Sequence, residues 1–168
     1  MASKTLVVCF SRGGTTMRVA EHLAKMLGAD LDRIEENGSR LGLGGYMRSA
    51  IEAMTKGLPS IRTRRDPRDY DLVVIGTPVW VGTISSPVRA YLFQHARDFR
   101  KVGFFAVMGG RGGEDVVREM QFASGVSSAP TCVLTERDVE HDRFRPRVES
   151  FVRSLVALLP TAPEVRAY

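Results

Sequence analysis

The sequence predicts an α/β protein with a doubly wound parallel sheet of five strands and helices on both faces. Short apolar, β-branched runs alternate with segments whose apolar residues recur at helical spacing. Some of these runs are unbroken, as in strands that are covered on both faces. No internal repeat or linker divides the 168 residues, so we expect one domain over residues 1–168.

Three strands are predicted in the first half of the chain. The first spans residues 4–10 and leads, through a glycine-rich turn, into a helix that begins at Thr16 and stops at Gly28. Residues 31–35 form a short second strand. The third strand, residues 71–76, is the clearest apolar run in the chain.

The segment between the second and third strands is rich in glycine. Residues 38–45 carry too many glycines for a helix, so we expect a loop there. Apolar residues at helical spacing then predict a short helix that begins at Tyr46 and ends near Gly57.

Two strands and three helices are predicted in the second half. The tripeptide Ser85-Ser86-Pro87 is typical of a helix start, with a capping serine and a proline in the first turn. The strands are residues 102–108 and 131–135, and the other helices are residues 114–123 and 144–159.

Composition and charge exclude several classes of protein. The apolar runs, of about six residues, are too short to span a bilayer, and residues 1–10 lack a secretory signal. We therefore expect a cytoplasmic protein without a membrane partner. The net charge of +5 favours anionic partners. Aspartates accompany the densest arginine cluster, residues 62–68, so we expect a solvated loop there and no nucleic-acid site. Cys9 and Cys132 lie in apolar runs, and neither a disulfide nor a metal site is expected.

Three segments of unusual composition follow predicted strands. They are residues 11–16, 77–82 and 109–113. Because the carboxyl ends of parallel strands meet at one edge of the sheet, all three segments can converge on one ligand.

The first segment, Ser11-Arg12-Gly13-Gly14-Thr15-Thr16, has the composition of a phosphate loop. Glycines let amides turn inward, hydroxyls donate, and the start of the following helix favours an anion. A plain strand–helix turn with a threonine cap is the alternative. The P-loop lysine and the G-x-G-x-x-G fingerprint are both missing. The C-x5-R pattern of cysteine phosphatases fails because the sixth residue after Cys9 is Thr15.

The other two segments indicate a flat ligand. Trp80, the only tryptophan, could stack on an aromatic ring or cover the hydrophobic core, and both interpretations remain open. The segment Gly109–Gly113 has four glycines in five residues, which suits backbone contacts to a ring edge.

The sequence resembles the bacterial flavodoxin-like flavoproteins, which bind FMN. The resemblance is carried by VVCFSRGGTTMRVAEHLA, by YDLVVIGTPVWVGTISSPVRAYL and by GFFAVMGGRGGED. It implies the strand order 2-1-3-4-5 and a set of FMN-binding residues. In that set the phosphate is held by Ser11, Arg12, Gly13, Gly14, Thr15 and Thr16; the ring is flanked by Thr77, Pro78, Val79, Trp80, Val81 and Gly82; and the pyrimidine side is approached by Gly109, Gly110, Arg111 and Gly112.

The chain departs from that family in three respects. Gly13 stands where the family usually has a threonine or serine, so one hydroxyl donor is lost. The chain is basic, whereas electron-carrier flavodoxins are typically acidic. Residues 42–61 also form a longer segment than in the smallest flavodoxins, either as an ordinary helix with its loop or as a cover or subunit contact.

Three functions remain open at this stage. The first is electron transfer through FMN. The second is an FMN-dependent quinone or nitro-compound reductase in which Arg12 and Arg111 receive NAD(P)H. The third is a non-enzymatic module that binds another phosphate ligand or a protein. No residue pair indicates a catalytic acid or base.

Overall fold

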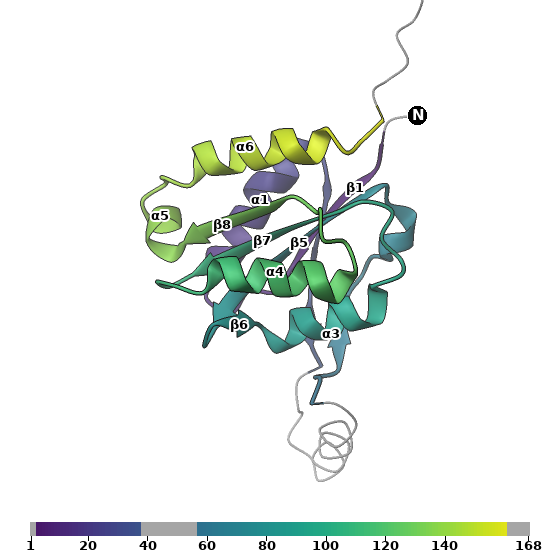
Figure 1. Cartoon of the computed structure of the whole chain (residues 1–168), viewed down its shortest axis with the longest axis horizontal. Coiled ribbons are helices and arrows are strands. Elements are labelled where there is room, and N and C mark those ends of the chain that lie inside the picture. Colours follow the sequence, from purple (N-terminus) through teal and green to yellow (C-terminus); the bar gives the residue numbers. More distant parts are fainter. Residues whose placement is uncertain (1–2, 38–56, 161–168) are drawn as a thin grey trace, which may run out of the picture.

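Five parallel strands form the main sheet in the order β2-β1-β5-β7-β8 (Figure 1). Counted along the chain this order is 2-1-3-4-5, which confirms the predicted topology. The computed structural model describes residues 3–37 and 57–160. The strands are β1 (Thr5–Cys9), β2 (Asp30–Arg33), β5 (Leu72–Trp80), β7 (Val102–Met108) and β8 (Thr131–Thr135).

Helices cover both faces of the sheet, as predicted. One face packs against α1 (Thr15–Leu27) and α6 (Arg145–Val156), and the other packs against α3 (Ser86–His95) and α4 (Gly113–Ser124) (Figure 1). Each face has its own apolar cluster, and the sheet separates the two clusters. Both faces of the central strands are therefore buried, as their unbroken apolar runs require.

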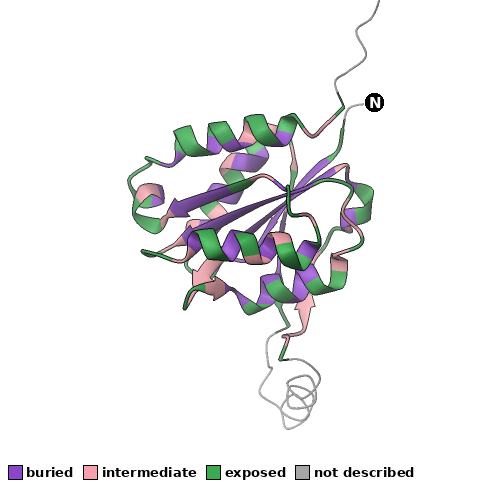
Figure 2. Ribbon diagram, viewed as in Figure 1, coloured by how far each residue is buried: buried purple, intermediate pink, exposed green. Residues whose placement is uncertain are grey.

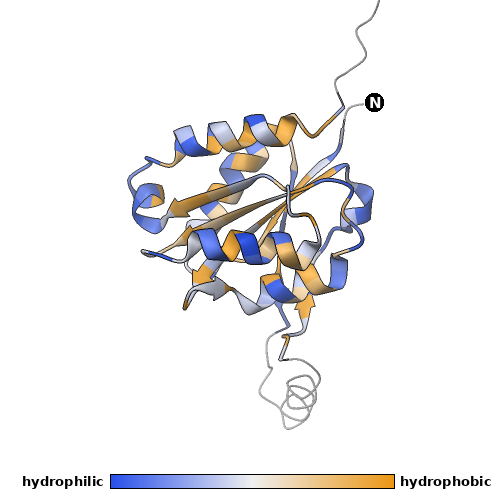
Figure 3. Ribbon diagram, in the orientation of Figure 1, coloured by the Kyte–Doolittle hydropathy of each residue, from blue (hydrophilic) through white to orange (hydrophobic). Residues whose placement is uncertain are grey.

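The pattern of burial follows the pattern of hydropathy. The strands at the centre of the sheet are buried and apolar, whereas the outward faces of the helices are exposed and polar (Figures 2 and 3). Helix α1 ends as predicted at Gly28, whose φ of 57° is left-handed and suits glycine. Among the described residues, no helix has the length and apolar character that a membrane crossing requires.

Some elements differ from the prediction. The predicted strand 31–35 is divided, because β1 ends at Cys9, which pairs with Arg33. After Arg33 one further bond joins the chain to the main sheet, from the Ile34 amide to the Cys9 carbonyl oxygen at 2.9 Å. The next strand, β3 (Glu35–Glu36), pairs instead with β4 (Ile61–Arg62). The sequence did not predict the short helix α5 (Glu136–Glu140) or the 3-10 helix η1 (Pro67–Asp69). The predicted loop at 38–45 and the helix before Gly57 lie outside the described residues.

Candidate functional site

The phosphate-loop candidate is shaped by one buried serine. The Ser11 hydroxyl oxygen accepts hydrogen bonds from the amides of Gly14 and Met17, at 3.1 and 3.2 Å. Gly14 precedes α1 with a φ of 91°, a conformation that favours glycine. Ser11 therefore bends the chain between β1 and α1 and orients the amides that lie between its two bonds.

Several amides of this loop have no acceptor within the protein. In the described part of the chain, no hydrogen bond is formed by the backbone N–H groups of Arg12, Gly13, Thr15 and Thr16. The last two belong to the first turn of the 13-residue helix α1, where the macrodipole favours negative charge. Such a group of donors suits an anion with several oxygens, and a phosphate is of that kind.

The loop of residues 11–16 touches the end of β5. The guanidinium carbon of Arg12 lies 4.7 Å from the centroid of the Trp80 ring. The Phe10 ring stands perpendicular to the Trp80 ring, with 5.4 Å between their centroids. The half-buried Trp80 thus meets the core through Phe10 and the loop through Arg12. A stacked ligand ring on Trp80 remains a prediction.

The predicted loop over residues 77–82 is a strand and a tight turn, so the expectation that the third strand ends at Gly76 was wrong. Strand β5 continues to Trp80 and pairs in a hairpin with β6 (Thr83–Ile84). Gly76 does not mark a strand end: a Cβ there would lie 2.0 Å from the Phe105 ring, so glycine makes room for that ring.

The turn of this hairpin consists of Val81 and Gly82. Their φ angles of 51° and 75° are both left-handed, as in the tight turns that join antiparallel strands. A β-branched residue rarely adopts this conformation, and the Val81 side chain is fully exposed. The hairpin therefore presents an apolar tip at the carboxyl edge of the sheet.

Two buried hydroxyls fix the base of the hairpin. Those of Thr77 and Ser85 lie 3.0 Å apart, and the Thr77 oxygen also accepts from the Ser85 amide at 3.2 Å. Both side chains are fully buried. Ser85 precedes α3 as predicted, but its hydroxyl bonds to Thr77 and not to a helix amide. The Thr77 side chain thus supports the hairpin from within, and its predicted contact with a ring stays a prediction.

A carboxylate from α4 holds the other strand of the hairpin. The Glu119 carboxylate accepts from the Thr83 hydroxyl at 3.0 Å and from the Arg89 guanidinium at 2.8 Å. Glu119 belongs to no motif and lies 36 residues from Thr83 in the sequence, so the sequence offered no signal for this contact.

The glycine-rich third segment packs on the hairpin. A Cβ at Gly112, whose φ is 92°, would lie 3.1 Å from the Gly82 Cα and 3.7 Å from the Val79 side chain. Only glycine permits this approach without displacement. Gly109, Gly110 and Arg111 are exposed beside it. The three predicted segments therefore meet at one edge of the sheet, at the left of Figure 1.

Two arginines of the converging segments differ from the predicted arginine cluster in their partners. Arg62, Arg64, Arg65 and Arg68 pair with Glu35, Asp30 or Asp66. By contrast, Arg12 and Arg111 are exposed and form no ion pair with any described residue. Unpaired cations are thus present beside the converging segments.

The two cysteines are buried and unsuited to nucleophilic chemistry. Burial raises the pKa of the Cys9 thiol to about 12, so the thiolate that a nucleophilic cysteine needs is not formed at neutral pH. Burial likewise raises the pKa of Cys132 to about 12. Across residues 3–37 and 57–160, no three His, Cys, Asp or Glu side chains are grouped to bind a metal ion.

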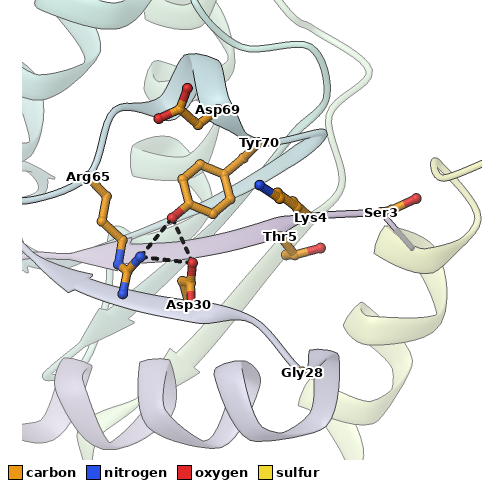
Figure 4. Close-up of a pocket in the computed structure, with 8 residues that line it drawn as sticks. All are labelled: Ser3, Lys4, Thr5, Gly28, Asp30, Arg65, Asp69 and Tyr70. Atoms are coloured by element: carbon orange, nitrogen blue, oxygen red, sulfur yellow. Dashed lines mark hydrogen bonds and ion pairs between the residues drawn. The ribbon is translucent and has the colours of Figure 1, made fainter. Parts of the chain in front are cut away.

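A hollow lies at the opposite, amino edge of the sheet (Figure 4). It has a volume of about 800 Å³. Its central polar groups satisfy one another: the Tyr70 hydroxyl donates to the Asp30 carboxylate at 2.7 Å, and Arg65 donates to the same carboxylate at 2.9 Å. Arg65 also donates to the Tyr70 oxygen at 3.1 Å.

Known structures share this fold. A flavoprotein from Lactobacillus acidophilus NCFM, solved in complex with FMN, has 24% identity and a TM-score of 0.63 over 86% of this chain and 99% of its own. A flavodoxin, WrbA-like protein from Agrobacterium tumefaciens has 19% identity and a TM-score of 0.55, over 92% and 99%. An NAD(P)H:quinone oxidoreductase from Methanothermobacter marburgensis has 14% identity and a TM-score of 0.53, over 96% and 98%.

Sequence comparisons give a family assignment. No curated protein matches the chain in a direct comparison. The family model described as flavodoxin, however, matches residues 4–149. This match spans most of the chain and contains all three converging segments, and the chain therefore belongs to the flavodoxin family.

Proposed function

We propose that the chain binds FMN at the carboxyl edge of the sheet and transfers electrons through it. The observation that carries the proposal is the group of amides in residues 12–16 without a protein acceptor, placed next to Trp80 and the hairpin. A phosphate supplies the acceptors that these donors lack. FMN joins such a phosphate to a flat ring, and the complex of the Lactobacillus flavoprotein with FMN is consistent with this choice.

Each converging segment has a separate part in this proposal. Residues 11–16 hold the phosphate, Trp80 and the hairpin tip flank the isoalloxazine, and Gly109–Gly112 approach its pyrimidine side. FMN supplies the redox chemistry, while the protein binds the ring, orients it and limits its contact with water. The bonds from Thr77 and Glu119 to the hairpin keep the ring-binding residues in place.

A reductase is the second candidate. It is supported by Arg12 and Arg111, two exposed guanidinium groups that have no carboxylate partner among the described residues. Such groups suit the phosphates of NAD(P)H. An assay of NAD(P)H oxidation with a quinone separates the two candidates. A reductase exceeds the rate of free FMN, and an electron carrier does not.

Isothermal titration tests the binding proposal itself. The protein is titrated with FMN, with riboflavin and with AMP, which has a phosphate but no flavin ring. We expect FMN to bind more tightly than either of the others. It alone has both a phosphate for residues 11–16 and a flavin ring for Trp80 and the hairpin. Equal binding of FMN and AMP would mean that the chain is a general phosphate-binding module.

A further inference from the structure

Arg33 contacts the phosphate loop from a neighbouring strand. It is the last residue of β2, in register with Cys9 of β1. One guanidinium nitrogen donates to the carbonyl oxygen of Ser11 at 2.6 Å, a short charge-assisted hydrogen bond. The sequence did not indicate this residue, which lies 22 positions from Ser11 and in no motif.

The bonded carbonyl belongs to the same peptide group as the Arg12 amide. Peptide bonds in the described chain are trans, so this C=O and this N–H point in opposite directions. By holding the carbonyl on one side, Arg33 fixes the direction of the amide on the other. A hydrogen bond to the carbonyl also polarises the peptide group and makes its N–H a stronger donor. The Arg12 amide is one of those without an acceptor among the described residues.

The backbone around Arg33 is itself fixed. The buried Asp32 carboxylate accepts from the amides of Arg33, Arg64 and Arg65, each at 2.8 Å. The Arg33 side chain forms no ion pair with a described carboxylate, unlike Arg62, which pairs with Glu35 at 2.8 Å. The pKa of Glu35 is lowered first by its hydrogen bond to Arg62 and also by the nearby charge of Arg33, so Glu35 offsets part of the Arg33 charge. The remaining charge of Arg33 adds to the positive potential at the loop.

We propose that Arg33 is a positioning residue that makes this loop select a phosphorylated flavin over an unphosphorylated one. The inference rests on the proposed binding of FMN. It assigns the selection to the charge of Arg33 and to its hydrogen bond with the peptide group between Ser11 and Arg12. It also explains how a loop with Gly13, which has one hydroxyl fewer than its relatives, can hold a phosphate.

The test compares the dissociation constants of FMN and riboflavin in wild type, Arg33→Gln and Arg33→Lys. Arg62→Gln is the matched control, because Arg62 is an exposed arginine on β4, outside the main sheet, and it pairs with Glu35. We expect Arg33→Gln to weaken FMN binding by roughly five- to tenfold, the loss of one charged hydrogen bond, with little change for riboflavin. Arg33→Lys keeps the charge and should recover part of the loss. Arg62→Gln should change neither constant.

A pH comparison separates charge from a structural role. The second pKa of a phosphate monoester is about 6, so the ligand loses one negative charge as the pH falls through that value. Wild type should therefore lose more FMN affinity between pH 7.5 and pH 5.5 than Arg33→Gln. Thermal unfolding shows whether each variant is folded. If Arg33→Gln is unfolded, the comparison of wild type with Arg33→Lys tests the role of Arg33 in its place.

The possible failures are distinguishable. If wild type does not bind FMN, the proposed function fails and this inference fails with it. If wild type binds FMN but Arg33→Gln weakens FMN and riboflavin equally, or neither, Arg33 does not select the phosphate.

Discussion

The two edges of the main sheet differ in how their polar groups are partnered. At the amino edge, Asp30, Arg65 and Tyr70 bond to one another beside a hollow of about 800 Å³ (Figure 4). At the carboxyl edge, four amides of residues 12–16 have no acceptor in the described chain. The first amides of a helix have no acceptor within the helix and bond to water, side chains or a ligand. Unpaired donors that gather in one loop are therefore a better candidate for an anion site than a hollow whose polar groups already bond to one another.

The largest effect should come from Ser11→Ala. The substitution removes the oxygen that orders the amides of Gly14 and Met17, so the remaining donors lose their common direction. We expect FMN affinity to fall about tenfold or more, measured by titration. Ser154→Ala is the control, since Ser154 is exposed on α6 and bonds only within its own helix. If Ser154→Ala loses as much FMN affinity as Ser11→Ala, the ordered amides at the carboxyl edge do not account for FMN binding.

Trp80→Ala tests whether the Trp80 ring stacks on the flavin. Loss of aromatic stacking should weaken FMN binding by about fivefold and shift the redox potential of the bound flavin. Phe122→Ala is the matched control, because Phe122 is an exposed aromatic residue on α4. If FMN affinity is unchanged in Trp80→Ala, Trp80 serves only to cover the core through Phe10.

Tyr70→Phe tests the amino edge. The substitution removes a hydroxyl that donates to Asp30 and accepts from Arg65, so the free energy of unfolding should fall by about 1 kcal/mol. FMN affinity should not change. Tyr91→Phe is the control, since the buried Tyr91 hydroxyl has no hydrogen-bond partner among the described residues and its removal should cost nothing. A loss of FMN affinity in Tyr70→Phe would show that the two edges are coupled.

Gly13→Thr should have the smallest effect, which is an increase in FMN affinity. A Cβ at Gly13 meets no atom within 4 Å, so a side chain fits there. The added hydroxyl restores the donor that related loops have, and FMN affinity should rise by about threefold. Gly13→Ala fills the same position without a hydroxyl and should leave the affinity near that of wild type. If both variants bind FMN as wild type does, the hydroxyl at this position is not needed.

The sequence predicted the elements that local pattern determines. The apolar runs of β5 and β7 indicated buried strands, and the crowded glycines and hydroxyls of residues 11–16 indicated a loop with free donors. Contacts between distant residues were not predictable in this way. Gly76 was interpreted as a strand end, but the Phe105 ring on a neighbouring strand requires it. Arg33 and Glu119 carry no local signal, because their roles depend on which strands and helices become neighbours.

The most direct test of the account is the absorbance spectrum of the protein after incubation with excess FMN and removal of the unbound ligand. We expect a yellow protein with the bands of a bound flavin and about one FMN per chain, because residues 11–16 and Trp80 lie together at one edge of the sheet. Ser11→Ala, treated in the same way, should retain less. A colourless wild-type protein would contradict the central claim that the unpaired donors at the carboxyl edge bind a flavin phosphate.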